Sequence, residues 1–184
     1  MIPLLVSAGV VVILVVAVVA SHNRFVDERA TLDSSWSNID TELQRRHDLV
    51  PNLVETVRGY ASHERDTFEH VTRARAAADT SSDPAARGRA ETELSRGLRS
   101  LLAVSEAYPD LRADAHFLDL QHQLITTENR IQAARRIYNG NVRDVNRHVR
   151  SIPSNLVARA FGFRAAPFFE LDPVTSAAVR DAPQ

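Results

Sequence analysis

The chain has 184 residues, a formal net charge of -1 and no cysteine. The balanced charge argues against a basic nucleic-acid-binding face, and the lack of cysteine excludes disulfides, thiolate nucleophiles and zinc–thiolate sites. Glycines number only 6 and aromatic residues make up 6%, while Ala, Leu, Val, Arg and Glu are abundant, so the composition favours helices over sheets.

Residues 2–20 form an uncharged apolar segment at the N-terminus. At about 1.5 Å per residue, a helix of this length extends roughly 29 Å, which matches the hydrocarbon thickness of a bilayer. A cleavable signal peptide is the alternative, with Val18 and Ala20 before a cut at Ser21. However, secretory signals normally have an Arg or Lys before the apolar segment, and none precedes it here. We therefore predict an uncleaved transmembrane anchor over residues 1–21.

The orientation of this anchor follows from the basic residues that flank it. The first two, Arg24 and Arg29, come after the apolar segment, and Asp27 and Glu28 between them make the bias modest. By the positive-inside rule, the short N-terminus is expected outside and the rest of the chain in the cytoplasm. The predicted location is thus the cell membrane, with a single pass.

A first amphipathic helix is predicted after the anchor, because apolar residues recur every three or four positions over residues 32–71. The pattern fades after about residue 75. Pro51 lies within it, and the apolar spacing resumes in phase on both sides of the proline. We predict a kinked continuous helix, with a turn over residues 48–52 as the alternative. The predicted apolar face comprises Leu32, Trp36, Ile39, Leu43, Val50, Leu53, Val57, Tyr60, Phe68 and Val71.

Two further long helices follow. The second is predicted over residues 85–107, with Asp83 as a capping residue and Pro84 suited to the first helical position. A third and longer helix begins near residues 112–114 and continues to about residue 152. Pro153 ends it, because proline cannot continue the hydrogen-bonding pattern of a helix.

The segment after this proline, residues 154–163, is predicted to form a short fourth helix. Phe168 and Phe169 are expected to dock on the bundle, and residues 171–184 to form a disordered polar tail. No segment alternates polar and apolar residues for long enough to predict a strand. We predict an all-α fold: an N-terminal transmembrane helix, then an antiparallel bundle of three long helices and a short C-terminal one over residues 22–170.

Two of the long helices carry an acid and a base on their apolar faces: Glu64 and Arg75 on the first, Glu128 and Arg135 on the third. An unpaired buried charge is costly, so these four are expected to pair with one another or with buried amides. The sequence leaves the pairing open. Two carboxylates in a bundle core would suit a di-iron or glycosidase site, but a polar network that sets helix register is the interpretation we prefer.

The histidines do not match a metal-binding pattern. A di-iron bundle uses Glu-x-x-His on two helices, and no glutamate here has a histidine three residues later. His63 and Glu64 miss the H-E-x-x-H zinc pattern because Thr67 stands at its last position. We expect all seven histidines at the surface. Phosphate-loop, nucleophile-elbow and dinucleotide motifs are absent, so we predict no enzymatic activity, no catalytic, cofactor-binding or metal-binding residue, and no cofactor.

Several blocks in consistent order show that the chain resembles the LemA family. They are "RRHDLVPNLVETVRGYASHE", "AYPDLRAD", "TTENRIQAARRIYN" and "VNRHVRSIP" followed by "FGF". The resemblance implies a bacterial single-pass membrane protein with a short outer N-terminus, a long antiparallel helical bundle and no established enzymatic activity. Family genes often lie near membrane-bound proteases, which indicates a class of partner.

An anchor and a helical bundle without a recognisable catalytic or metal-binding motif predict a membrane-anchored scaffold. Its expected partners are proteins, membrane proteases among them, or a second copy of itself. The alternative is a regulator or sensor of membrane-protein quality control or envelope stress. No nucleic acid and no small-molecule substrate is expected. The contact surface is predicted on the arginine-rich faces, at Arg45 and Arg46 and at Arg135 and Arg136.

Overall fold

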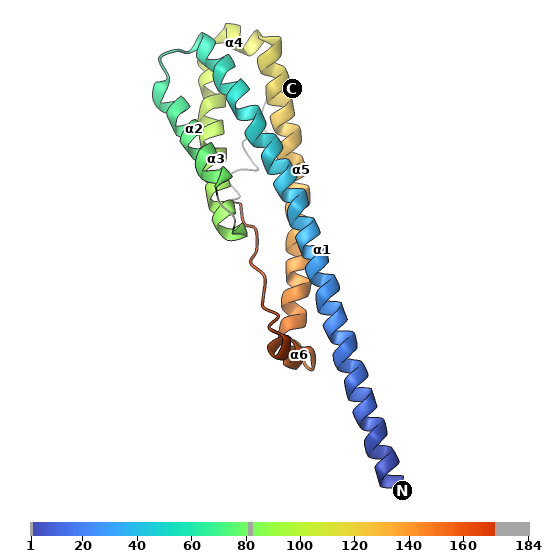
Figure 1. The fold of residues 1–184 in the computed structure, drawn as a ribbon. Coiled ribbons are helices and arrows are strands. Elements are labelled where there is room, and N and C mark those ends of the chain that lie inside the picture. The colour runs from blue at the N-terminus through green and yellow to red at the C-terminus, as the bar shows by residue number, and fades with distance from the viewer. Residues whose placement is uncertain (1, 81–82, 172–184) are drawn as a thin grey trace. The chain divides into compact units, whose positions relative to one another are not determined.

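The computed structural model describes residues 2–80 and 83–171, so the predicted tail from residue 172 onward lies outside the described residues (Figure 1). Within them the chain is helical and has no strand, which confirms the all-α prediction. The elements are α1 (Ile2–Tyr60), α2 (Arg65–Asp79), α3 (Pro84–Val104), the 3-10 helix η1 (Ser105–Ala107), α4 (Pro109–Ala113), α5 (Ala115–Arg150) and α6 (Ser154–Phe161).

Helix α1 joins the apolar N-terminal segment and the first amphipathic stretch in one element. Pro51 lies inside it, so the prediction of a continuous helix through this proline is confirmed. The prediction that the same helix extends to about residue 75 is wrong, because α1 ends at Tyr60 and α2 begins at Arg65. Gly59 precedes this break and Ser62 lies within it, and both residue types have lower helix propensity than alanine.

Capping residues define where the later helices begin. Asp83 accepts a hydrogen bond of 2.9 Å from the Ala86 amide, and Pro84 occupies the first turn of α3, as predicted. Asp114 precedes α5 and accepts from the Phe117 amide at 2.8 Å. This hydrogen bond, together with that from the Tyr60 hydroxyl, holds the pKa of Asp114 below its usual value. Polar caps thus satisfy amides that lack partners within the helix.

The chain divides into two compact units. Among the described residues, the first unit comprises residues 2–37 and 137–167, and the second unit comprises residues 38–80, 83–136 and 168–171. Helices α1 and α5 therefore each contribute a segment to both units. In the second unit α2 and α3 lie side by side (Figure 1). The apolar core of this unit consists of Leu49, Val50, Leu53, Val54, Val57, Ala61, Phe68, Val71, Ala74, Ala78, Leu94, Leu98, Leu101, Leu111, Phe117, Leu120 and Leu124.

The first unit has a smaller core centred on Phe25. Its ring is stacked on the ring of His148, with centroids 4.0 Å apart, and on that of Phe163 at 4.6 Å. Val157 and Ala158 of α6 complete this core. Helix α6 ends at Phe161 and is capped by Gly162, whose φ of 76° lies in the left-handed region that favours glycine. The short fourth helix is therefore confirmed, and it packs on the part of α1 that follows the apolar segment.

An extended C-terminal segment, residues 163–171, follows α6. Within the first unit, the Asn146 side chain donates to the Ala166 carbonyl at 3.0 Å and accepts from the Ala166 amide at 2.7 Å. Within the second unit, Phe169 is fully buried and Leu171 nearly so, and Arg135 donates to the Leu171 carbonyl at 3.1 Å. The predicted docking of Phe169 is confirmed. Backbone groups of an irregular segment thus find partners in side chains of α5.

Candidate functional site: a buried ionic cluster

The second unit contains a cluster of buried charged side chains from three helices. Arg46 and His47 of α1 are 2% and 0% exposed, and Glu91 of α3 and Glu128 of α5 are 0% and 6% exposed. The same unit places Ser95 of α3 against Arg46. Residues of these types are rarely buried unless they are paired, so their partners decide what the cluster can do.

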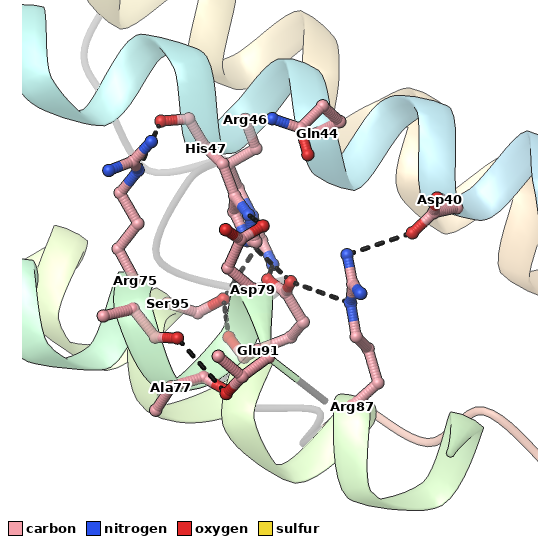
Figure 2. Close-up of polar contacts among 12 residues, drawn as sticks. Asp40, Gln44, Arg46, His47, Arg75, Ala77, Asp79, Arg87, Glu91 and Ser95 are labelled. Atoms are coloured by element: carbon pink, nitrogen blue, oxygen red, sulfur yellow. Dashed lines mark hydrogen bonds and ion pairs between the residues drawn. The ribbon is translucent and has the colours of Figure 1, made fainter. Parts of the chain in front are cut away.

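Arg46 is the centre of the cluster (Figure 2). Its guanidinium donates through Nη2 to Glu91 Oε2, and through Nη1 to Glu128 Oε2 and to Ser95 Oγ, both at 3.1 Å. His47 Nε2 donates to the second oxygen of Glu91, Oε1, at 2.8 Å. One arginine therefore links α1 to α3 and α5 through two carboxylates, and the neighbouring histidine shares one of them.

A rim of further charged groups surrounds this centre, in which Arg87 is buried and the side chains of Asp40 and Asp79 are more than half exposed. Arg87 Nη2 pairs with Asp40 Oδ1 at 3.0 Å, and its Nε lies 3.8 Å from Glu91 Oε1. Asp79 Oδ1 lies 3.6 Å from His47 Nδ1. Arg75 Nε donates to the backbone carbonyl of His47 at 2.9 Å (Figure 2). The arginines of the cluster thus offset the charges of the two glutamates.

The protonation state of Glu91 follows from its neighbours. Burial raises the pKa of this carboxyl, but the positive charge of Arg46 and the hydrogen bond from His47 together outweigh burial and hold the pKa below its usual value. Glu91 is therefore an ionised hydrogen-bond acceptor at neutral pH. A carboxylate whose oxygens accept from Arg46 and His47 suits a structural ion pair better than a general acid or base.

The four charged residues that the sequence predicts to be buried lie in different environments. Only Glu128 belongs to the buried cluster, where Gln132 Nε2 also donates to it at 2.6 Å. Arg75 lies at its rim. Glu64 is wrongly predicted as buried, because the helix breaks there and Glu64 becomes the half-buried residue before α2. Arg135 pairs with a backbone carbonyl rather than with an acid.

Sequence reasoning missed Arg46, His47 and Glu91. The prediction that all seven histidines lie at the surface is wrong for His47, and the predicted exposed face at Arg45 and Arg46 is half wrong, because Arg46 is buried. The sequence does contain an indication that Arg46 and His47 are buried. On the apolar face of α1, the next apolar residue after Leu43 is a valine seven positions later, and the residues three and four positions after Leu43 on that face are Arg46 and His47.

The described residues contain no group of three or more His, Asp or Glu placed to hold a metal ion. The cluster therefore offers no ligand set on which to build metal chemistry within the part of the chain that the structure describes. The structure shows charge-assisted hydrogen bonds that link α1 to α3 and α5, which is an arrangement suited to setting the register of the three helices.

Comparisons with known proteins find a family and three relatives of this chain. The LemA family model matches residues 35–183. Magnetosome protein MamQ 2 and magnetosome protein MamQ 1 of Paramagnetospirillum magneticum are each 24% identical over 196 residues, covering 92% of this chain and 72% of the relative. Magnetosome protein MamQ of Magnetospirillum gryphiswaldense is 22% identical over 178 residues, covering 83% of this chain and 65% of the relative.

One helix, near the N-terminus, is long and apolar enough to cross a membrane. The family match begins after its apolar part and includes every residue of the ionic cluster. The family match thus covers the part of the chain that contains the helical bundle. Because the match extends over most of the sequence, and because the resemblance found in the sequence blocks is thereby confirmed, the chain belongs to the LemA family.

Proposed function

We propose that this protein is a membrane-anchored scaffold, in which α1 fixes a helical domain to a bilayer and the domain binds protein partners. The observation that carries the proposal is the continuity of α1. The apolar side chains of residues 10–16 are each more than half exposed, and the same helix continues without a break into the buried cores of both units. An apolar surface of this extent requires a cover, and a bilayer matches its length.

The ionic cluster supports a scaffold rather than an enzyme. A scaffold needs a rigid surface, and buried charge pairs contribute specificity of packing more than stability. Arg46 connects helices α3 and α5 to α1 and admits one register between them. The exposed side chains of the same helices, such as Arg45 and Arg136, are then held in fixed relative positions within the second unit.

A regulator or sensor that acts with membrane proteases is the alternative. Such a protein would need the cluster to change state in response to a signal. Glu91 is buried and ionised, so its protonation is an unsuitable switch near neutral pH. For this reason we place the scaffold first and keep membrane proteases as a class of partner to test.

Photo-crosslinking from the bundle surface tests the scaffold. A photoreactive amino acid replaces Arg136 or Arg45 in the full chain in native membranes, and both side chains are exposed. Reproducible crosslinks to one protein, or to a second copy of the chain, would support the proposal. The matched control places the probe at Ile131, which is fully buried and should give none. Scanning the other exposed positions of the second unit without any specific crosslink would refute a scaffold.

The orientation of the anchor is tested separately. The chain has no cysteine, so Ser62→Cys introduces a unique thiol at an exposed position between α1 and α2. With the helical domain in the cytoplasm, a membrane-impermeant maleimide should label this thiol only after the cells are permeabilised. Equal labelling of intact cells would place the domain outside and reverse the proposed topology.

A further inference from the structure

The first unit exposes large apolar side chains around α6. Ile152 is 85% exposed, Leu156 63% and Phe161 55%. The opposite side of α6 is already used, because Val157 and Ala158 pack on Phe25. Leu156 lies on the side of α6 away from these two residues, Phe161 at its C-terminal end and Ile152 in the turn before it, so that they leave an apolar surface that water covers poorly.

The position of α6 relative to the apolar segment indicates what covers this surface. The ring of His22 on α1 lies 4.7 Å from the ring of Phe161 and 5.5 Å from that of Phe163, in edge contacts. His22 follows Ala20, the last residue of the apolar segment, by two positions, or about 3 Å along the helix axis. The headgroup layer on each side of a bilayer is roughly 5 to 8 Å deep. When residues 2–20 span the bilayer, α6 therefore lies at the level of the headgroups (Figure 1).

The charge of this region is complementary to anionic headgroups. Residues 145–169 contain four arginines and no Asp or Glu. Among the described residues, the exposed side chains of Arg150, Arg159 and Arg164 form no ion pair with an acid. Arginines beside exposed apolar residues on a short amphipathic helix are typical of segments that lie in the membrane interface, and each arginine near an anionic leaflet adds attraction.

A cavity of about 450 Å³ opens beside α6, and its lining includes Ser21, Arg24 and Arg147. Both of these arginines already pair with acids: Arg24 with Glu28 at 2.9 Å, and Arg147 with Asp144 at 2.6 Å. Their charges are therefore largely offset. The attraction for headgroups is assigned instead to Arg150, Arg159 and Arg164, which pair with no acid among the described residues.

We propose that α6 and the turn before it form an interfacial anchor that binds the anionic phospholipid surface of the bilayer that α1 spans. The apolar side chains enter the interface, and the three arginines contact headgroup phosphates. This inference rests on the proposed membrane anchor. Its consequence is a second attachment point, which would fix the first unit against the membrane instead of leaving it free to tilt on a single helix.

The test uses the full chain in lipid nanodiscs with one introduced thiol that carries an environment-sensitive fluorophore. Ala160→Cys places the probe on the exposed side of α6 and leaves Leu156 and Phe161 intact. Ser34→Cys is the matched control, exposed in the same unit but about 21 Å beyond Ala20 along α1. Val12→Cys reports on the span itself. Nitroxide-labelled lipids and an aqueous iodide quencher measure where each probe resides.

Lipid quenching at Ala160 and Val12, with iodide quenching at Ser34, is the expected result. If the Ala160 probe is as open to iodide as the Ser34 probe while the Val12 probe is shielded, the interfacial anchor is overturned and the membrane anchor stands. If the Val12 probe is also open to iodide, the membrane anchor fails and the interfacial anchor fails with it. The two failures are thus distinguishable.

The headgroup preference is tested with a charge variant. Replacing Arg150, Arg159 and Arg164 together by Gln should lower lipid quenching at Ala160 by about twofold in nanodiscs rich in phosphatidylglycerol, and much less in pure phosphatidylcholine. The control replaces three exposed arginines of the second unit by Gln, namely Arg65, Arg89 and Arg112. If both triple variants lower lipid quenching at Ala160 equally, the quenching depends on the net charge of the protein and not on this surface. That result would overturn the proposed headgroup contacts.

Discussion

Arg46 links three helices of the second unit through its side chain. It is buried and binds the carboxylates of Glu91 and Glu128, which are 45 and 82 residues further along the chain and belong to two other helices. Three buried charges in contact are costly to desolvate, so they are tolerable only when every member keeps its partner. Changes at single residues of this cluster should therefore have large effects.

Glu91→Gln is expected to destabilise the protein by about 3 to 5 kcal/mol, because it leaves Arg46 and Arg87 with one buried carboxylate fewer. The matched control is Glu93→Gln on the same helix, where a half-exposed carboxylate pairs with Arg96. That change should cost less than about 1 kcal/mol. Thermal unfolding of both variants, followed by circular dichroism in detergent micelles, measures the difference. Similar melting temperatures for the two variants would contradict a structural role for the cluster.

The acid sensitivity of the protein is expected to depend on Glu91. Its pKa is lowered in the folded state, so its contribution to stability is fully present above the unfolded pKa and is lost as the pH falls through the folded value. The wild type should therefore lose stability below about pH 4 more steeply than Glu91→Gln. Melting temperatures as a function of pH compare the two. Parallel curves would show that the acid response does not depend on Glu91.

At the scale of elements, the glycines of α1 and α3 have opposite roles. A Cβ at Gly59 would meet nothing within 4 Å, whereas a Cβ at Gly88 would overlap the Glu170 carbonyl and lie 3.2 Å from its carbonyl carbon. Both positions are helical, so alanine is intrinsically favoured at each by up to about 1 kcal/mol. At Gly88 the C-terminal segment must move to make room.

Gly59→Ala is therefore expected to raise stability by about 0.5 to 1 kcal/mol, and Gly88→Ala to lower it. In Gly88→Ala, faster amide hydrogen exchange should appear around Phe169, which is buried in the wild type. Denaturant unfolding measures the free energy of unfolding of both variants, and hydrogen exchange measures the amide exchange rates. If Gly88→Ala is as stable as Gly59→Ala and its exchange is unchanged, the C-terminal segment does not pack on α3 as closely as the structure has it.

At the scale of the whole molecule, α1 carries the apolar segment and also contributes side chains to the cores of both units. The proposed membrane anchor and the folded core therefore depend on the same helix, and the anchor can be tested by changing the apolar segment alone. Replacing Val12 and Val15 by Arg should release the protein from membranes, because each arginine near the centre of a span costs about 2.5 to 3.5 kcal/mol of insertion free energy.

Extraction of membranes with alkaline carbonate measures this release. The matched control replaces Leu118 and His122 by Arg, which adds two arginines at exposed positions of α5. The control should stay in the membrane pellet together with the wild type. Retention of the Val12 and Val15 variant in the pellet would contradict a spanning helix, whereas loss of the control would point to general misfolding.

The sequence by itself determined the helical class, the apolar segment and the positions of several helix boundaries. These features depend on periodicity and on short-range hydrogen bonds, which residues close in the chain specify. Asp83 at the start of α3 is an example, since its cap requires only the amide three residues later. The break at residues 61–64 was missed, because the apolar spacing continues in phase across it and periodicity cannot distinguish a turn from a helix there.

Only the tertiary structure decided which charges meet. Four charged residues on apolar faces predicted a buried network, yet Glu64 and Arg135 lie outside it, and Arg46, His47 and Glu91 form its centre. The position of a side chain on a helix face follows from its own sequence neighbours. Its partner on another helix depends on axial register and rotation, which are set by packing between helices that are far apart in the chain.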